Sequence, residues 1–172
     1  MTSLPERTEI RASVRLVVFD FDGVFTDNTV WTDDAGTEWV RCWRGDGLGL
    51  QKLRDLGIPT WVLSTENHPV VSRRCEKLGI PCRQGLADKY EALQTLMAEA
   101  GVAPGDVVYL GNDINDAACL RAVGVPIVVH DAHADVVPLA RFQTRKPGGF
   151  GAVREVCDWL ASGAPARAAV PP

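Results

Sequence analysis

The sequence predicts an α/β fold, a Rossmann-like doubly wound parallel sheet with helices on both faces. Short apolar runs alternate with helical stretches along the chain, which is the pattern of a parallel sheet. The length of 172 residues is that of one ordinary domain. Polar residues directly follow three of the apolar runs. Because such a sheet binds ligands beyond the carboxyl ends of its strands, a functional site is expected at that edge.

The first predicted strand covers residues 14–19, an apolar run cut off by acidic residues. A hairpin is expected next, with arms at residues 29–32 and 37–43 around a turn rich in Asp and Gly. In its second arm, Trp39 and Trp43 share one face at period two. These tryptophans fit either the core or, as we prefer, a contact surface with another subunit.

Helical stretches separate the remaining strands. Strands are predicted at residues 60–63, 107–110 and 126–129, and helices at about 46–56, 69–78, 88–100, 117–123 and 151–161. Asp46 and Asp88 are the expected N-caps of two of these helices, and Gly79 is an expected helix end. Residues 1–13 form an N-terminal extension, residues 14–161 the domain, and the Ala/Pro-rich residues 162–172 an expected disordered tail.

Composition excludes several classes of protein. The chain has 18 Lys and Arg against 22 Asp and Glu, a net charge of −4, which argues against binding to nucleic acid or to an anionic membrane. No apolar run approaches the ~18 residues of a membrane-spanning helix, and the polar N-terminus is not a secretory signal. Five cysteines without a CxxC pair argue against disulfides or a zinc site and favour a reducing, cytoplasmic compartment.

Acidic residues collect where two predicted strands end. Asp20 and Asp22 follow the first strand, Ser64 and Thr65 follow the second, and Asp113 lies in the loop after the third. Three carboxylates at one sheet edge would repel each other, and Mg²⁺ with a few waters and a substrate phosphate would relieve that repulsion. The alternative, that these acids are helix caps and turn residues, fits any one of them but not the set.

With a metal in place, phosphoryl transfer follows. Asp20 could attack phosphorus to give an aspartyl-phosphate, while Asp22 could protonate the leaving oxygen and later deprotonate water. The Ser64 hydroxyl and the Lys89 ammonium could face the negative phosphoryl oxygens, although Lys89 alone would read as a surface lysine.

Two other motifs are weaker. The glycines at 45, 47 and 49 have the wrong spacing for dinucleotide binding. Residues 146–149 fit an anion-binding loop or an ordinary turn equally well.

At this point the sequence resembles the haloacid dehalogenase superfamily. The segment 20–27 (DFDGVFTD), Ser64, Lys89 and the segment 111–116 (GNDIND) match its four motifs in order. The closer resemblance, over about residues 14–160, is to its capless sugar-acid phosphatases: the octulosonate 8-phosphate and nononate 9-phosphate phosphatases and the C-terminal domain of acylneuraminate cytidylyltransferases. The predicted projecting hairpin and the helix at 46–56 already fill the chain between Asp22 and Ser64, so no cap domain is expected there. The resemblance likewise implies a capless enzyme, and a homotetramer in which a neighbouring subunit covers the site.

The resemblance also implies a role for each matching residue. Asp20 would be the nucleophile and a Mg²⁺ ligand, Asp22 the acid/base and a ligand through its carbonyl, and Asp113 a further ligand. Ser64 and Lys89 would hold the phosphoryl group. Asp116 would orient Lys89, and Asn112 belongs to the same motif. The family often has Thr at position 64, so whether Ser64 or Thr65 is the functional hydroxyl stays open.

The substrate is indicated less sharply. Glu66, Arg74 and Lys77 resemble positions that nonulosonate 9-phosphate phosphatases use, whereas octulosonate enzymes tend to have a basic residue at position 66. A Glu can accept hydrogen bonds from hydroxyl groups, and Arg74 and Lys77, about one helical turn apart, can meet a carboxylate. Ordinary surface charge is the alternative. We expect a nonulosonate 9-phosphate, with octulosonate 8-phosphate next.

Other functions fit less well. A receiver-type signalling domain needs an acceptor Asp where this chain has Ser64 and Thr65, and a phosphomutase needs a cap. Two alternatives stay open: a free-standing cytidylyltransferase-type module that mainly oligomerises, and a phosphatase acting on an unrelated small phosphate.

Overall fold

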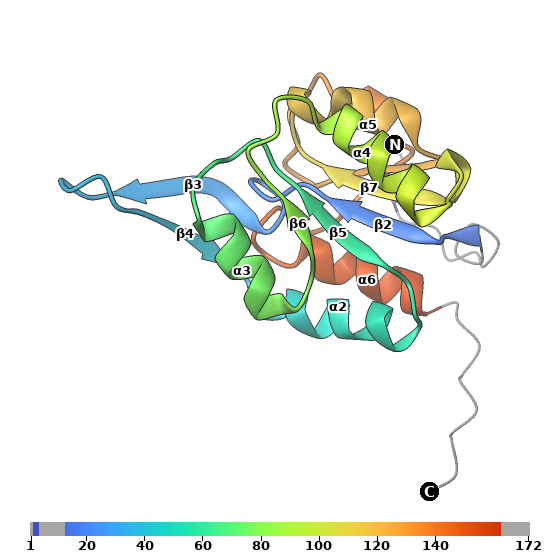
Figure 1. Ribbon diagram of the computed structural model, residues 1–172, viewed down its shortest axis with the longest axis horizontal. Coiled ribbons are helices and arrows are strands. Elements are labelled where there is room, and N and C mark those ends of the chain that lie inside the picture. The colour runs from blue at the N-terminus through green and yellow to red at the C-terminus, as the bar shows by residue number, and fades with distance from the viewer. Residues whose placement is uncertain (1, 4–12, 163–172) are drawn as a thin grey trace, which may run out of the picture.

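The computed structural model describes residues 2–3 and 13–162. Seven parallel strands form one sheet in the order β1-β9-β8-β7-β2-β5-β6, with helices on both faces (Figure 1). The predicted doubly wound α/β fold is confirmed. The strands of this sheet are β1 (Thr2–Ser3), β2 (Leu16–Phe19), β5 (Thr60–Leu63), β6 (Cys82–Arg83), β7 (Val107–Gly111), β8 (Val125–Val128) and β9 (Phe142–Gln143).

The helices form two layers. The α-helices are α2 (Asp46–Asp55), α3 (Val70–Leu78), α4 (Lys89–Ala100), α5 (Ala117–Ala122) and α6 (Ala152–Ala161), and the short 3₁₀ turns are η1 (Pro104–Asp106), η2 (Ile114–Asp116) and η3 (Val137–Leu139). Residues of α2, α3 and α6 pack on one face of the sheet, and those of α4 and α5 on the other. A sheet covered in this way needs strands that are apolar on both faces.

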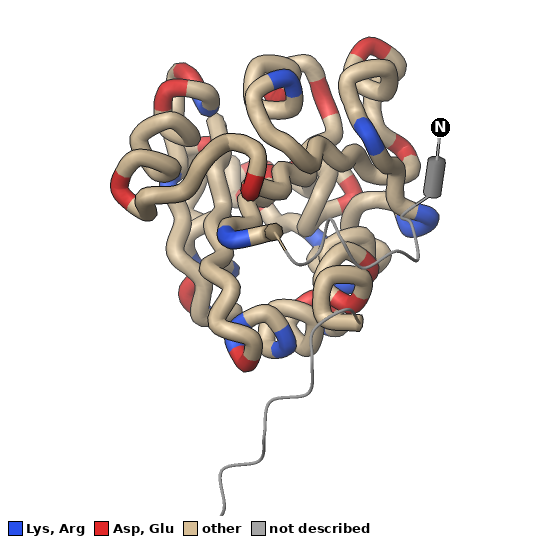
Figure 2. The backbone as a smooth tube through the Cα atoms, turned by 90° about the vertical axis from the view of Figure 1, so that its right-hand side faces the viewer, with Lys and Arg blue, Asp and Glu red and all other residues tan. Residues whose placement is uncertain are grey.

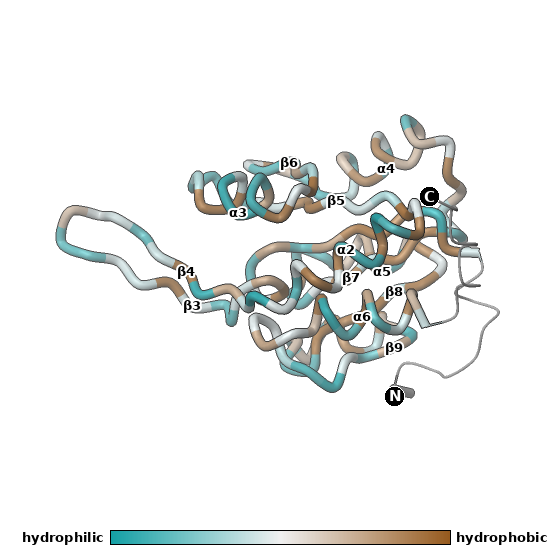
Figure 3. Tube along the Cα trace, turned by 90° about the horizontal axis from the view of Figure 1, so that it is seen from below, coloured by the Kyte–Doolittle hydropathy of each residue, from teal (hydrophilic) through white to brown (hydrophobic). Residues whose placement is uncertain are grey.

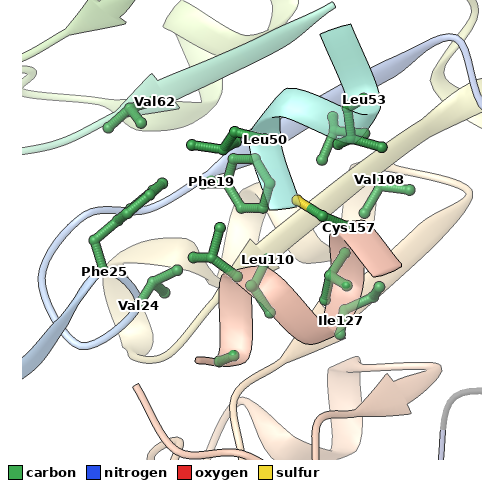
Figure 4. Close-up of a cluster of buried hydrophobic side chains, with 14 of the residues drawn as sticks. Phe19, Val24, Phe25, Leu50, Leu53, Val62, Val108, Leu110, Ile127 and Cys157 are labelled. Atoms are coloured by element: carbon green, nitrogen blue, oxygen red, sulfur yellow. The ribbon is translucent and has the colours of Figure 1, made fainter. Parts of the chain in front are cut away.

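Strand β2 shows why the first apolar run is continuous. Val17 and Phe19 pack toward α2 and α6, as the close-up in Figure 4 shows for Phe19. Leu16 and Val18 belong to the cluster on the opposite face. All four side chains are fully buried. This placement puts the next residue, Asp20, at the carboxyl end of a central strand, between β5 and β7.

The hairpin of β3 (Thr26–Thr32) and β4 (Glu38–Cys42) forms a separate two-stranded sheet. It extends away from the layered body (Figures 1 and 3), and the described residues form no cap domain. The first arm begins three residues earlier than predicted. Trp31 pairs with Trp39 across the strands, and these side chains are 66% and 52% exposed. A single chain therefore leaves a pair of tryptophans without cover.

Several predicted helix ends are confirmed and one is wrong. The Asp88 carboxylate caps α4 by accepting the Tyr90 backbone N–H at 2.7 Å, and Gly79 ends α3 in the left-handed conformation. Asp46, however, is not an N-cap: it is the first residue of α2, after Gly45. Its carboxylate instead accepts the backbone N–H of Arg154 at 3.1 Å, so it links α2 to α6.

Three two-residue strands, β1, β6 and β9, were not predicted, because two residues carry no periodicity. Within the expected N-terminal extension, Thr2 and Ser3 pair with β9. Of the expected tail, residues 163–172 lie outside the described part of the chain.

The remaining composition-based expectations can also be placed on the structure. Three of the five cysteines are buried and all five are free. No described helix is long and apolar enough to cross a membrane. Acidic and basic residues are interspersed over the face shown in Figure 2.

Candidate active site

The carboxyl ends of β2, β5 and β7 meet at one pocket of about 300 Å³. It is lined by Asp20, Asp22, Asn28, Thr65, Asn112, Asp113, Ile114 and Asn115. The three acids expected to converge therefore do so. They arrive from separate parts of the chain because β2 pairs with β5 on one side and with β7 on the other.

Asp20 is held rigidly at the base of the pocket. Its backbone N–H donates to the Leu110 carbonyl at 2.9 Å, continuing the β2–β7 ladder. Its Oδ1 accepts the Phe21 N–H at 2.7 Å and lies 2.6 Å from Lys89 Nζ. The side chain is 4% exposed yet belongs to the pocket lining. Asp20 thus presents a carboxylate, held by these contacts, to a ligand that enters the pocket.

Lys89 is the link between two buried acids. Its ammonium donates to Asp116 Oδ1 at 2.9 Å as well as contacting Asp20. Asp116 accepts three further hydrogen bonds: from the Tyr109 hydroxyl at 2.7 Å and from the backbone N–H groups of Asn112 at 2.8 Å and Asp113 at 3.3 Å. Asp116 therefore orients both the lysine and the loop that carries Asp113.

This cluster contains two buried carboxyl groups and a single ammonium group. Burial, together with the charge of Asp116, raises the pKa of Asp20 to about 8 against the opposing effect of Lys89. Burial lowers the pKa of Lys89, but the two carboxylates outweigh it, so the net shift is upward. Among the described residues, Lys89 is the one cation within ion-pair distance of either acid.

Asp22 lies beside Asp20 in the same pocket. Burial, and then the charge of Glu66, raises the pKa of Asp22, which favours a protonated carboxyl. The chain turns sharply here because Gly23 has a φ of 74° and lies against the Asn112 side chain, where a Cβ would collide. The short D-x-D-G segment can therefore bring its two carboxyl groups to one place.

The oxygen donors of the pocket fit a hard cation. Asp20 and Asp113 supply carboxylates, and the buried Asn112 Oδ1 has no hydrogen-bond partner within the described part of the chain. Asp113 Oδ1 also accepts the Ile114 N–H at 2.7 Å, capping η2. No three His, Cys, Asp or Glu side chains of the described residues form a complete metal cluster. A cation here would need backbone carbonyls, water or substrate oxygens as further ligands, as Mg²⁺ prefers.

Two hydroxyl groups end β5, and the structure separates them. Ser64 is buried, and its Oγ accepts the Glu66 backbone N–H at 3.1 Å. Thr65 is exposed and lines the pocket itself. The Ser64 Oγ thus contacts the loop backbone, and Thr65 is the one of the two hydroxyl residues that lines the pocket.

The three expected substrate residues do not share the acidic pocket. Glu66 lines an adjoining pocket of about 340 Å³, which shares Asp22, Asn28 and Thr65 with the first. Arg74 and Lys77 line a third pocket of about 560 Å³, which shares only Val40 and Val70 with the second. Arg44 and Arg73 also line this third pocket, so it is strongly basic.

The loop of residues 146–149 does not offer free amides to an anion. The Gly148 N–H donates to Asp131 Oδ1 at 2.9 Å and the Gly149 N–H to the Val24 carbonyl at 3.1 Å. Of the two readings of this loop, the structure supports a turn that packs against the segment after Asp22.

Two residues of the site were missed. Tyr109 lies within an otherwise apolar strand, and its buried hydroxyl holds Asp116; a phenol in such a run is a weak signal that a buried polar partner exists. Asn28, which lines both adjoining pockets, follows Asp27 within β3 and carries no sequence signal of a site residue.

Comparison with known proteins places this geometry in a family. Residues 84–154 match the haloacid dehalogenase-like hydrolase family. The chain is 35% identical over 149 residues to the 3-deoxy-D-manno-octulosonate 8-phosphate phosphatase KdsC of Escherichia coli K12, covering 86% of this chain and 79% of that protein.

Solved structures agree. The 3-deoxy-D-manno-octulosonate 8-phosphate phosphatase of Yersinia pestis superimposes with a TM-score of 0.87 at 33% identity, covering 92% of this chain and 86% of that one. The corresponding enzyme of Moraxella catarrhalis, solved with a magnesium ion, a phosphate ion and KDO, superimposes with a TM-score of 0.87 at 32% identity, covering 91% and 90%.

Proposed function

This chain belongs to the haloacid dehalogenase-like hydrolases and is a phosphatase related to the octulosonate 8-phosphate phosphatases, and from that premise we propose that it is a magnesium-dependent phosphatase of a small sugar-acid phosphate. The observation that carries the proposal is the fixed contact between Asp20 and Lys89 at the base of a pocket that also holds Asp22 and Asp113.

Asp20 is the nucleophile in this proposal. One of its carboxylate oxygens attacks phosphorus, an O–P bond forms to give an aspartyl-phosphate, and the P–O bond to the sugar breaks. Lys89 and the Phe21 N–H contact Oδ1 of Asp20, which fixes this oxygen and aims the other. Such positioning removes most of the orientational cost of the attack.

Asp22 moves the proton. Its raised pKa, which burial causes first, lets it hold a proton that passes to the departing sugar oxygen. The Asp22 carboxylate then takes a proton from water, the water oxygen attacks phosphorus, and the O–P bond to Asp20 breaks. Inorganic phosphate leaves and both carboxyl groups regain their starting states.

The metal and the polar groups offset the charge of the phosphoryl group. Asp20 and Asp113 with the Asp22 carbonyl would hold Mg²⁺, which stabilises the negative charge on the transferring phosphoryl oxygens. Lys89, oriented by Asp116, and the hydroxyl groups of Ser64 and Thr65 supply the remaining donors. The magnesium bound by the Moraxella catarrhalis relative supports this assignment.

The adjoining pocket supports a polyol substrate. It is lined by acceptors and hydroxyl groups, including Glu38, Glu66 and Thr29, which suit sugar hydroxyls rather than a second anion. The relatives support an octulosonate 8-phosphate. A nonulosonate 9-phosphate is the second candidate, favoured by Glu66, whose Oε1 is held by the His68 backbone N–H at 2.8 Å and which stands where octulosonate enzymes tend to have a basic residue.

The basic pocket of Arg74 and Lys77 would then bind the carboxylate of the sugar acid, within one subunit or across two. The exposed Trp31 and Trp39 support assembly of the chain into a homotetramer in which a neighbouring subunit covers the site.

Two measurements test the function. Phosphate release from p-nitrophenyl phosphate should depend on Mg²⁺ and fall at least about 10³-fold in Asp20→Asn, because the amide is a far weaker nucleophile than the carboxylate. In a panel of substrates, the kcat/KM values for octulosonate, nononate and N-acetylneuraminate phosphates should then exceed those for unrelated phosphates such as nucleotides. Preference for a nucleotide would refute the sugar-acid assignment, and equal activity in Asp20→Asn would refute the nucleophile. A wild-type chain without phosphatase activity would leave the oligomerisation module as the better reading.

A further inference from the structure

Asn28 occupies an unusual backbone conformation beside the active site. Its φ is 61°, and it is the single non-glycine residue with a positive φ among those the structure describes. It lies where the β3–β4 pairing shifts register between Thr26 and Val30, so it belongs to a β-bulge. Bulges next to active sites often redirect a side chain.

Glycine would satisfy this backbone with less strain. A left-handed conformation is sterically unfavourable for a residue with a Cβ, less so for Asn, and costs Gly almost nothing. The local hydrogen bonds do not need the Asn28 carboxamide either. Thr26 Oγ1 accepts the Asn28 backbone N–H at 3.2 Å, and Asp27 Oδ1 accepts the Thr29 hydroxyl at 2.6 Å. The bulge is therefore built by the neighbours of Asn28.

The carboxamide of Asn28 is available to a ligand. It forms no hydrogen bond with any described residue, and Asn28 is exposed. Asn28, Asp22 and Thr65 are the three residues that line both the acidic pocket and the adjoining pocket. A phosphate ester bound at Asp20 would place its first carbons at this junction. The proton carrier Asp22 and the Thr65 hydroxyl lie there too, and Asn28 adds a group that both donates and accepts hydrogen bonds.

We propose that Asn28 is a specificity-determining residue, whose carboxamide binds a hydroxyl group on the carbon next to the phosphorylated carbon of a polyol substrate. This inference rests on the proposed phosphatase function and adds to it the substrate hydroxyl that is recognised where the two pockets meet. A site that hydrogen-bonds a substrate hydroxyl discriminates strongly against analogues without it, since its polar group is then left unpaired.

The test compares the wild-type chain with Asn28→Gly, which keeps the backbone conformation and removes the carboxamide. Three substrates are used: the panel member that the wild type prefers, its deoxy analogue without the neighbouring hydroxyl, and p-nitrophenyl phosphate. The ratio of kcat/KM for the sugar phosphate to that for p-nitrophenyl phosphate should fall at least tenfold in Asn28→Gly, mainly through KM. For the wild type, kcat/KM should be at least tenfold lower on the deoxy analogue than on the parent sugar phosphate. For Asn28→Gly, kcat/KM should differ little between these two substrates.

Asp34→Gly, at the exposed tip of the same hairpin, is the matched control and should keep the wild-type ratio. A thermal unfolding curve shows that Asn28→Gly folds. The inference is wrong if kcat/KM of that variant falls equally on the sugar phosphate and on p-nitrophenyl phosphate. It is also wrong if the variant still discriminates against the deoxy analogue as the wild type does. Failure of the proposed function looks different, because the wild type itself would then release no phosphate.

Discussion

Lys89 is the side chain on which the buried charges of the site depend. It lies 2.6 Å from Asp20 and 2.9 Å from Asp116, and none of the three side chains is more than 4% exposed. Buried ion pairs gain little over apolar residues, because desolvation offsets their attraction, but the loss of one partner leaves an uncompensated charge. Lys89 therefore affects stability as well as chemistry.

We predict that Lys89→Met destabilises the chain by about 3–5 kcal/mol, as expected when one partner of a buried pair is removed. Urea unfolding at neutral pH measures this change. Adding Asp116→Asn to Lys89→Met should recover part of the lost free energy of unfolding, since it removes one of the two buried carboxyl groups that no longer have an ion-pair partner. A single-variant loss below about 1 kcal/mol, with no recovery in the double variant, would contradict this description.

At the scale of elements, Asp46 joins α2 to α6. Its Oδ1 accepts the Arg154 N–H, but its buried Oδ2 has no hydrogen-bond partner among the described residues. Burial raises the pKa of Asp46 to about 7, against the hydrogen bond from the Arg154 backbone and the charges of Arg74 and Arg154. The folded chain thus holds a proton that the unfolded chain, with an Asp pKa near its ordinary value of 3.8, has already released.

This shift fixes the sign of a pH dependence. Between about pH 4 and pH 7 the folded state binds more protons at Asp46, so this residue makes the free energy of unfolding fall as pH rises. Asp46→Asn should remove that fall. The stability of the variant relative to wild type should grow by up to about 4 kcal/mol from pH 4 to pH 8.

Thermal or urea unfolding across that pH range checks the prediction. Asp55→Asn, on the exposed side of the same helix, should show no such trend. A stability difference between Asp46→Asn and wild type that stays constant with pH would count against a buried, proton-retaining Asp46.

Element types were largely predictable, and their shortest members were not. The apolar run ending at Phe19 and the capped helix at Lys89–Ala100 carry clear periodicity and end signals. The cap at Asp46 was predicted wrongly, because the sequence does not show that the Arg154 N–H lies beside its carboxylate. Two-residue strands such as β6 and β9 exist only through pairing with their neighbours.

At the scale of the whole molecule, the hairpin is the feature one chain does not explain. Trp31 and Trp39 are exposed, and the hairpin that carries them extends away from the layered body (Figure 1), while Val40 and Cys42 at its base pack against the core. Large exposed aromatic residues of this kind mark interaction surfaces. The proposed homotetramer would bury them.

We predict that Trp31→Glu combined with Trp39→Glu yields a monomer, because charges on this face oppose its burial. Light scattering coupled to size-exclusion chromatography measures the mass, and Asp34→Asn at the hairpin tip should assemble as the wild type does. A monomeric wild type at micromolar concentrations, or a tetrameric double variant, would contradict the prediction.

The site was predictable to the extent that strand ends carry chemistry. Topology alone brings Asp20, Asp22 and Asp113 to one pocket, since parallel strands end at one edge. Which side chains reach the pocket and which support it from behind was not predictable. Thr65 rather than Ser64 lines the pocket, and the Tyr109 hydroxyl donates to Asp116 from within a strand. The separation of Arg74 and Lys77 into a different pocket from Asp20 depends on where α3 lies, which helical spacing does not encode.

The most direct test of the account looks for the covalent intermediate. The enzyme is mixed with Mg²⁺ and substrate, quenched in acid during turnover, and treated with borohydride, which reduces an acyl phosphate to an alcohol. Mass spectrometry of the peptide that spans residue 20 should then show homoserine in place of Asp20, and only when substrate was present. Steady phosphate release with Asp20 unchanged, or homoserine at position 22 instead, would contradict the central claim.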